Sequence, residues 1–188
     1  MWIGYWCFSE CLSLNLSQCS LFKRRKKLAM NDNIHPWKQS EVIRHSQLLC
    51  HSFQYWTGDS LIDPNDNPVI LSEKLFFAPF VVVSHGMESD PIFNYANQLA
   101  LKLWQMNWED FTRMPSRYSV EPTEQSEREV MLKKSLEQGL ISNYRVLRTT
   151  SQGDRFFIED VILWTMLDEQ NQPCGQAAMF MHWTPIVE

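Results

Sequence analysis

The chain has 188 residues, of which 44% are hydrophobic and 13% aromatic, and its formal net charge is −5. This length fits one domain of about 100–150 residues plus an extension, and the apolar content excludes a chain that is disordered throughout. Without residues 1–29, 12 basic and 21 acidic residues remain, a net charge of −9. A domain this acidic repels phosphate backbones, so we expect no nucleic-acid partner.

Residues 1–29 differ in character from the rest. An apolar start is interrupted by polar residues and followed by the basic run 23–27. A signal peptide carries its positive charge first, and a spanning helix needs about 20 mostly apolar residues, so we expect no stable membrane insertion. The segment is expected to be poorly ordered, or an over-extended start with Met30 as the natural first residue; a weak anchor on anionic lipid is the alternative. The domain is expected over residues 30–188.

The five cysteines indicate a cellular compartment rather than a metal-binding site. Cys7, Cys11 and Cys19 lie in the extension, while Cys50 and Cys174 lie far apart in the body. An odd number without a credible signal peptide favours a reducing, cytoplasmic setting. The spacing of the first three fits no compact zinc motif, so we expect no metal site.

Residues 35–56 predict an amphipathic helix. Val42, Leu49, Phe53 and Trp56 recur at helical spacing and form one stripe, and Gly58 is placed to end the helix. Residues 61–74 are rich in turn formers and predict a loop, and residues 80–84 are β-branched and predict a strand. The stripe must be buried, either against the sheet of the same chain or in a dimer.

Residues 90–117 are the best-defined stretch of the chain. The pattern predicts a strand over residues 92–96, then Asn97 as the N-cap of a helix over residues 98–105. Asn107, with Asp110 three residues later, predicts the start of a second short helix, and Pro115 stops it.

Residues 121–139 predict a solvent-exposed helix that ends at Gly139. From residue 142 the period becomes two, which predicts three strands: one before the turn at 151–154, one over residues 155–167 and one over residues 176–184. Simple alternation within the second strand assigns two sets of apolar side chains to opposite faces, namely Phe156, Ile158, Ile162, Trp164 and Met166 against Phe157, Val161, Leu163 and Leu167. The helix at 35–56 is the available cover for the outer face.

These elements predict an α+β fold, with a five-stranded antiparallel sheet, helices on one face and an N-terminal amphipathic helix. A cone-shaped fold of the NTF2 type would place its helices first and its strands afterwards, which this order does not do. One helix is about 10–12 Å wide and strands lie about 4.8 Å apart, so a single helix leaves part of the outer face open. We therefore expect a homodimer through residues 35–56 and the outer sheet face.

Several motifs point to one family. Tyr95-Ala96-Asn97, between a strand and a helix, is similar to the Tyr-x-Asn sequence of PAS domains. With Ser84-His85-Gly86, the run WEDFTRMPSR at 108–117 and GQAAMF at 175–180, the chain resembles the MEKHLA family of PAS-like domains over residues 34–184, although the six letters that name the family do not occur. The resemblance implies a sensory or protein-interaction module, of the kind found alone in bacteria and at the C-terminus of some plant homeodomain–zipper transcription factors. It implies no particular cofactor.

The sequence contains no nucleophile elbow, zinc-protease helix or phosphate-binding loop, so no catalytic residue is assigned. His85, at a strand end, could contact a ligand, act as a base, bind haem iron or be satisfied by the backbone of a turn. Aromatic residues could line a pocket for a small apolar ligand or fill the core. The candidate pocket residues are His85, Tyr95, Trp104, Trp108, Phe111, Tyr144, Phe156 and Trp164.

The expected function is therefore that of a small sensory or interaction module, which binds a small apolar ligand or a protein partner and signals without catalysis. A small α+β enzyme with a pocket between sheet and helices, and a haem-binding sensor, are the alternatives.

Overall fold

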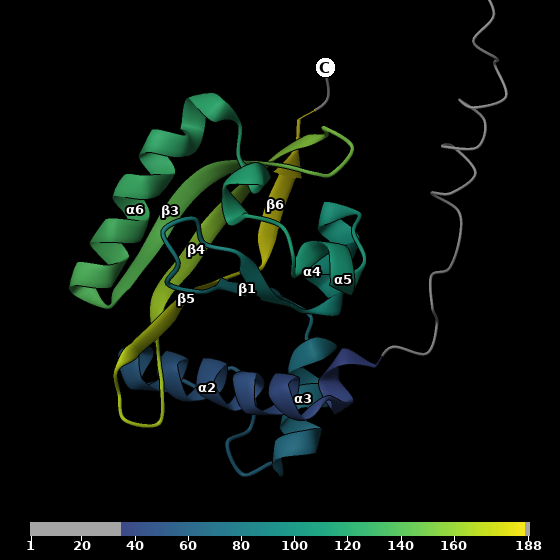
Figure 1. The fold of residues 1–188 in the computed structure, drawn as a ribbon, viewed down its shortest axis with the longest axis vertical. Coiled ribbons are helices and arrows are strands. Elements are labelled where there is room, and N and C mark those ends of the chain that lie inside the picture. The colour runs from purple at the N-terminus through teal and green to yellow at the C-terminus, as the bar shows by residue number, and fades with distance from the viewer. Residues whose placement is uncertain (1–34, 187–188) are drawn as a thin grey trace, which may run out of the picture. The chain divides into compact units, whose positions relative to one another are not determined.

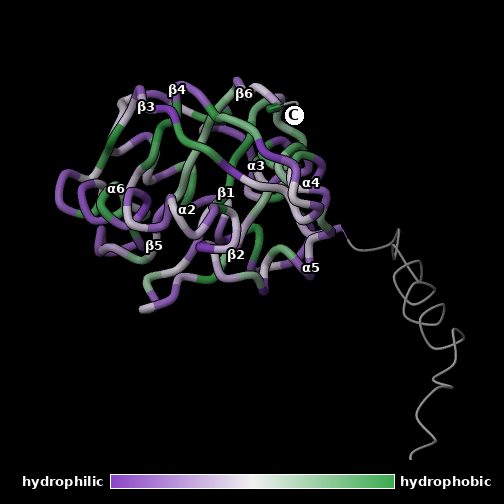
Figure 2. The backbone as a smooth tube through the Cα atoms, turned by 90° about the horizontal axis from the view of Figure 1, so that it is seen from above, coloured by the Kyte–Doolittle hydropathy of each residue, from purple (hydrophilic) through white to green (hydrophobic). Residues whose placement is uncertain are grey.

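The computed structural model describes residues 35–186, and the extension expected over residues 1–29 lies outside this range. The described residues form an antiparallel sheet with helices on both faces (Figure 1). The strand order is β2-β1-β5-β4-β3, and β6 also pairs with β4. Hydrophobic residues concentrate in the interior of the chain trace, and hydrophilic residues dominate the loops at its periphery (Figure 2).

The elements follow the predicted order. The strands are β1 (Val81–His85), β2 (Phe93–Ala96), β3 (Leu140–Thr149), β4 (Arg155–Leu167), β5 (Pro173–Phe180) and β6 (His182–Pro185). The helices are α2 (Ser40–Thr57), α3 (Pro68–Phe76), α4 (Gln98–Trp104), α5 (Trp108–Phe111) and α6 (Gln125–Gln138), with short 3-10 turns η1 (Pro36–Lys38), η2 (Ser116–Ser119) and η3 (Pro122–Glu124). The single last strand that we expected is two strands, β5 and β6, which run in succession along β4.

Helix α2 covers one face of the sheet, as its apolar stripe predicts. Leu49 and Phe53 are buried and pack in one cluster with Val82 of β1 and Trp164 of β4. The indole nitrogen of Trp56 donates a 2.8 Å hydrogen bond to the carbonyl of Thr165. The helix ends at Gly58, whose φ of 79° is left-handed, so the predicted glycine terminator is confirmed.

The loop predicted over residues 61–74 is wrong in its second half, because α3 begins at Pro68. The side chain of Asn67 accepts hydrogen bonds from the backbone nitrogens of Val69, at 3.1 Å, and Ile70, at 3.0 Å. Proline suits the first turn of a helix, where its missing N–H has no partner to lose. The helix buries Leu71 and Leu75 beside α2.

Substitution of Asn67 by alanine is expected to lower the free energy of unfolding by about 0.5–2 kcal/mol, because two backbone N–H groups lose their cap. The measurement is the urea midpoint of the full chain. Asn65→Ala is the control, since that side chain bonds only Asp63 in an exposed loop and should change stability by less than about 0.5 kcal/mol. Equal midpoints for both variants and the parent would contradict the cap.

Helices α4 and α5 lie on the other face of the sheet. Asn97 caps α4 as predicted, accepting from the nitrogen of Ala100 at 3.1 Å, and Asn107 caps α5, accepting from the nitrogen of Asp110 at 2.8 Å. Trp104 of α4 and Phe111 of α5 are buried on this face. Both predicted caps are therefore confirmed.

A β-bulge in β4 overturns the predicted assignment of its faces. Tyr144 of β3 lies opposite Val161, but Val146 lies opposite Ile158, so β4 contains one residue more than β3 over this interval. Asp160, with a φ of 52°, lies at this point. An extra residue reverses the alternation of every side chain that follows it in the strand.

The two halves of β4 therefore belong to different cores. Phe156, Ile158 and Val161 pack on the side of α4 and α5. Trp164 and Met166 pack on the side of α2 and α3. Simple alternation had placed Phe156 and Trp164 on one face, and this is incorrect.

The outer edge of β2 is paired with the segment after α5. The backbone nitrogen of Phe93 donates to the carbonyl of Met114 at 3.0 Å, and the nitrogen of Ser116 donates to the carbonyl of Pro91 at 2.8 Å. A β-bridge joins Ile92 to this segment. The 114–116 segment thus occupies hydrogen-bonding groups that an edge strand would otherwise expose.

Strand β3, at the opposite edge, carries irregularity and charge. Asn143 has a φ of 60°, and the register with β4 shifts there. Arg145 pairs with Glu159 at 3.0 Å, and its guanidinium lies 3.6 Å from the ring centroid of Phe157. Arg145 is thus an exposed side chain with its own partners.

Candidate functional site

A cavity of about 60 Å³ lies between the sheet and α6. Its walls come from all the strands of the sheet except β6, and from α4, η2 and α6. Helix α6 lies across this side of the sheet near β3 (Figure 1). One water needs about 10–15 Å³, so the cavity admits a molecule of a few non-hydrogen atoms.

His85 brings a neutral imidazole to this cavity from the end of β1. Its Nδ1 lies 2.9 Å from the carbonyl oxygen of Gly86, and because a carbonyl only accepts, Nδ1 carries the proton and Nε2 is left as an acceptor. Burial lowers the pKa of His85 to about 4. Gln176 lies opposite on β5, and its side chain donates to the carbonyl of Leu132 in α6 at 2.8 Å.

Two arginines line the same cavity. Arg128 of α6 donates a short hydrogen bond to the hydroxyl of Ser116, and burial lowers the pKa of Arg128. Arg148 of β3 donates to the carbonyl of Leu147 at 2.8 Å, and burial lowers the pKa of Arg148 to about 10. Within residues 35–186 neither guanidinium forms an ion pair, and no aspartate or glutamate lines the cavity.

Three of the eight predicted pocket residues line the cavity, namely His85, Trp104 and Tyr144. Phe111 and Phe156 lie on the same side of the sheet but only support its wall, Phe156 through an edge contact of 5.4 Å between ring centroids with Trp104. Tyr95, Trp108 and Trp164 pack in the cluster beneath α2 and α3, on the other face.

Arg128, Arg148, Ser116 and Gln176 were missing from the prediction. Arg128 lies on a helix covered with charges, and Arg148 lies in a strand at the sheet edge, so both resemble ordinary surface residues in the sequence. The one available signal was the position of Arg148, which falls on the same face of its strand as Tyr144 and Val146.

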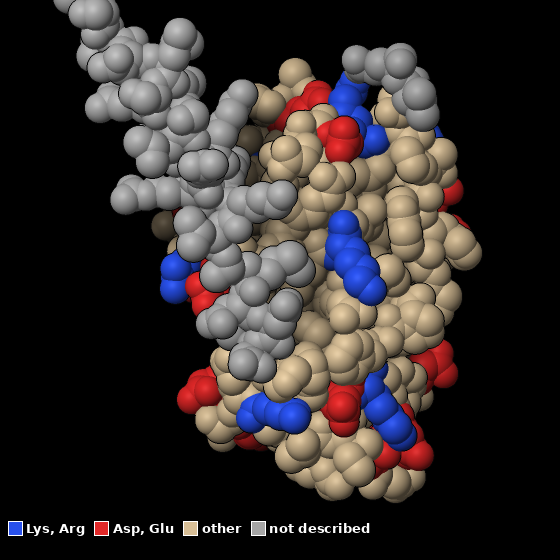
Figure 3. Space-filling model, turned by 90° about the vertical axis from the view of Figure 1, so that its right-hand side faces the viewer, with Lys and Arg blue, Asp and Glu red and all other residues tan. Residues whose placement is uncertain are grey.

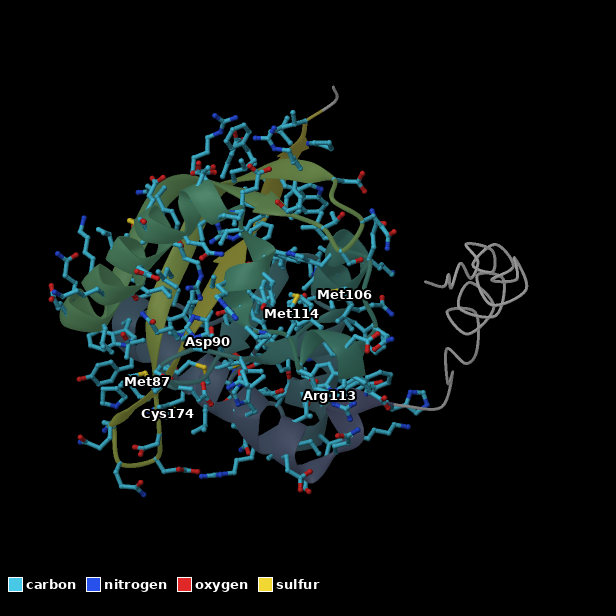
Figure 4. The ribbon with its side chains drawn as sticks, turned by 45° about the horizontal axis from the view of Figure 1, so that its top comes forward. Met87, Asp90, Met106, Arg113, Met114 and Cys174 are labelled. Carbon is cyan, nitrogen blue, oxygen red and sulfur yellow. The ribbon has the colours of Figure 1, made fainter. Side chains whose placement is uncertain are left out.

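Met87, in the loop after β1, and Cys174, near the start of β5, lie at the same end of the sheet (Figure 4). This agrees with the pairing of His85 and Gln176, each two residues further into its strand. Asp90, in the same loop as Met87, forms an ion pair of 3.1 Å with Arg117. The carboxylate of Asp90 is therefore already paired, whereas that of Glu88, in the same loop, opposes the effect of burial on the pKa of His85.

A second hollow, of about 260 Å³, lies between α2, the loop after it and the start of α3. Its acid, Asp66, is paired with Lys74 at 2.7 Å. Burial raises the pKa of the Cys50 thiol there to about 12, which leaves it unreactive at neutral pH. Unlike the first cavity, it has no unpaired buried charge among the described residues, so we take the first as the candidate site.

The comparisons decide the family. The sequence model of the MEKHLA domain matches residues 43–185. The chain belongs to the MEKHLA family. The PAS domain of a protein from Colwellia psychrerythraea superposes on this MEKHLA domain with a TM-score of 0.52 and 14% identity, covering 61% of this chain and 92% of that one.

An RNA-binding Light-Oxygen-Voltage receptor gives a TM-score of 0.53 with 15% identity, over 66% of this chain and 36% of the receptor. At these identities the likeness shows a shared PAS-like α+β fold. No curated protein sequence matches the chain. Over residues 35–186, the MEKHLA domain has no cluster of three His, Cys, Asp or Glu side chains suited to a metal ion, and no helix long and apolar enough to cross a membrane.

A hydrogen-bonded chain links α2 of the MEKHLA domain to β1 and β2. The hydroxyl of Ser84 donates to the side-chain oxygen of Asn94 at 2.6 Å, and Nε2 of His45 lies 2.8 Å from the same hydroxyl. Since the Ser84 proton is directed to Asn94, His45 is the donor in its contact with Ser84. Burial lowers the pKa of His45 to about 4.

Acid is expected to destabilise the domain through His45 and His85. Both imidazoles have pKa values of about 4 when folded, whereas an unfolded histidine has a pKa of about 6.5. The stability that each provides is complete above pH 6.5 and is lost as the pH falls towards 4, by about 2–3 kcal/mol per residue.

Urea midpoints of the parent and of His85→Gln, measured at several pH values, should show a smaller loss of stability in acid for the variant. His51→Gln, at an exposed residue bonded to Asn171, should keep the parental slope. A parental slope in His85→Gln would contradict the expectation.

Proposed function

We propose that this MEKHLA domain is a sensory module, which receives a small molecule in the cavity beneath α6 and signals through a protein contact, without catalysis. The observation that carries this proposal is the cavity itself, where desolvated polar groups converge from separate elements. Such groups cost stability unless a ligand or partner uses them, and they gather at binding sites. A cytoplasmic location, expected from the cysteines, is part of the same proposal.

The two alternative functions fit the geometry less well. His45 and Ser84 are close enough for a nucleophile and its base, but the Ser84 proton is already directed to Asn94 and the hydroxyl is buried. A haem or flavin needs a pocket of several hundred Å³, against the cavity of about 60 Å³. Binding of a much smaller molecule is therefore the better-supported function.

Ligand binding can be tested with a screen of metabolite-sized carboxylates, amides, alcohols and aromatic compounds against the full chain. A ligand at a hundred times its dissociation constant adds about 2.7 kcal/mol to the free energy of unfolding, and so raises the melting temperature. Leu132→Phe, on the cavity side of α6, should abolish the increase by filling the cavity. Leu136→Phe, at an exposed position one turn further, should preserve it. If no compound raises the melting temperature of the parent, the proposed function fails.

We also propose that the domain self-associates through the outer side of α2 and α3. The surface expected from the sequence was residues 35–56 with the outer sheet face. The stripe that motivated this expectation is buried within one chain, since Leu49 and Phe53 contact the sheet. Tyr55 of α2, Ile70 of α3 and Phe77 remain 41–56% exposed on these elements, which supports a contact on their outer side. On the face seen in Figure 3, basic and acidic side chains of the described residues are interspersed, a pattern that favours a protein over a nucleic acid as partner.

Light scattering is expected to give the mass of a dimer for the full chain at high micromolar concentration, and of a monomer for the double variant Tyr55→Glu, Phe77→Glu. Both positions are about half exposed, and the melting temperature of the variant checks that the fold survives the loss of the ring contacts of Phe77 with Trp37 and Phe76. A parent that stays monomeric would overturn self-association.

A further inference from the structure

We infer that the ligand of the cavity beneath α6 carries a carboxylate, which Arg128 and Arg148 bind together. This inference rests on the proposed function, and it replaces the small apolar ligand expected from the aromatic residues. The cavity walls present two guanidinium groups and no acidic side chain.

Arg148 carries most of the inference. It projects from β3 into the cavity wall, where its guanidinium donates to one backbone carbonyl, that of Leu147. A guanidinium has five N–H donors, and a cation that is partly buried without an acidic partner costs more free energy than a neutral side chain of the same size. Within residues 35–186, therefore, no acidic group forms an ion pair with Arg148 or accepts its remaining N–H donors.

Arg128 adds a second positive charge from the opposite wall. Its guanidinium is held by the hydroxyl of Ser116, which fixes its position with a neutral partner and leaves it without an ion pair among the described residues. The two positive charges repel one another, and this repulsion adds to the effect of burial in lowering the pKa of Arg148. An anion between them would remove this repulsion and accept hydrogen bonds from both.

The acids that act on these arginines lie outside the cavity lining. Glu127 and Glu129 are exposed on α6, and Asp90 is paired with Arg117. None of the three closes an ion pair with Arg128 or Arg148. The described residues thus supply no internal anion for the site.

Size and shape favour a carboxylate. A carboxylate matches the planar fork of arginine, and two arginines can hold both of its oxygens. Two further residues of the cavity wall carry donors, Tyr144 and Trp104, and the indole nitrogen of Trp104 is buried without a partner among residues 35–186. The volume of about 60 Å³ limits the ligand to a few non-hydrogen atoms.

The test is isothermal titration of the full chain with acetate, pyruvate, succinate and inorganic phosphate, beside the neutral analogues acetamide and succinamide. At least one carboxylate should bind the parent, and its amide should bind between about tenfold and a hundredfold more weakly, the range for loss of a charged hydrogen bond. Arg148→Met and Arg128→Met should each weaken the carboxylate by a similar factor. Arg145→Met, three positions before Arg148 in β3 and outside the cavity, should bind like the parent.

Folding and binding are separated by the melting temperature. Without ligand, Arg148→Met should melt no lower than the parent, because it removes a partly buried charge that has no ion pair. Should it fail to fold, Arg148→Lys keeps the charge without the fork and should still weaken the carboxylate. Amides that bind as tightly as carboxylates, or phosphate that binds more tightly than every carboxylate, would overturn the inference and leave the proposed function standing. Failure of every compound in this set would overturn the inference, whereas the proposed function fails only if the wider screen with alcohols and aromatic compounds also finds no ligand.

Discussion

Replacement of Asn97 by alanine should lower the free energy of unfolding by about 3–5 kcal/mol, since this one side chain has three buried partners. Its oxygen accepts from the nitrogen of Ala100 at 3.1 Å and from the nitrogen of Val82 at 3.2 Å, and its nitrogen donates to the carbonyl of Phe80 at 2.6 Å. Asn97 therefore caps α4 and also ties the helix to the start of β1. Alanine would leave all three backbone groups buried without these partners.

Asn107→Ala provides a matched control. Asn107 caps α5 with the same geometry, but it lies at the surface, where water can replace the lost bond to Asp110. We expect a loss below about 1 kcal/mol for this variant. Denaturant unfolding of the two variants beside the parent measures the difference, and equal losses would show that the contacts of Asn97 to β1 contribute nothing.

Substitution of Gly139 by alanine is expected to lower the free energy of unfolding by about 3–5 kcal/mol, from two separate causes. Its φ of 80° is a conformation that side chains disfavour. An added Cβ would also lie 2.3 Å from the indole ring of Trp56, which is fixed by its hydrogen bond to Thr165. The end of α6 and the end of α2 could not both keep their positions.

Gly58→Ala separates these two causes. Gly58 has nearly the same φ, 79°, and no atom lies within 4 Å of an added Cβ. Backbone strain alone should then cost about 1–2 kcal/mol. Thermal unfolding of both variants tests this difference, and a loss in Gly139→Ala no larger than in Gly58→Ala would mean that Trp56 moves aside freely.

Local signals in the sequence were sufficient for most of the fold. The caps Asn97 and Asn107 and the terminators Gly58 and Gly139 mark the helices because each supplies a hydrogen bond or a backbone conformation that its position requires. Helix α3 escaped prediction, because Asn67 and Pro68 serve equally well in a turn and at a helix start. Only the burial of residues that come later in the chain distinguishes the two.

The candidate site was less predictable than the fold. Aromatic residues were chosen for their size, yet Tyr95 and Trp164 lie in one core and Phe156 in the other, because the bulge at Asp160 reverses the faces of β4. No local sequence pattern predicts an extra residue in a strand. The partial burial of Arg148 depends on how α6 packs over β3, the strand that follows it directly, and the sequence does not display this packing.

The pairing of the sheet edges restricts how a partner could attach. Proteins often recruit one another by adding a strand to a free sheet edge, which needs a row of unused backbone groups. At β2 that row already bonds the 114–116 segment, and at β3 the irregularity at Asn143 and the charge of Arg145 interrupt it. The same devices protect sheets from stacking into aggregates. Addition of a partner strand is therefore disfavoured at the β2 and β3 edges.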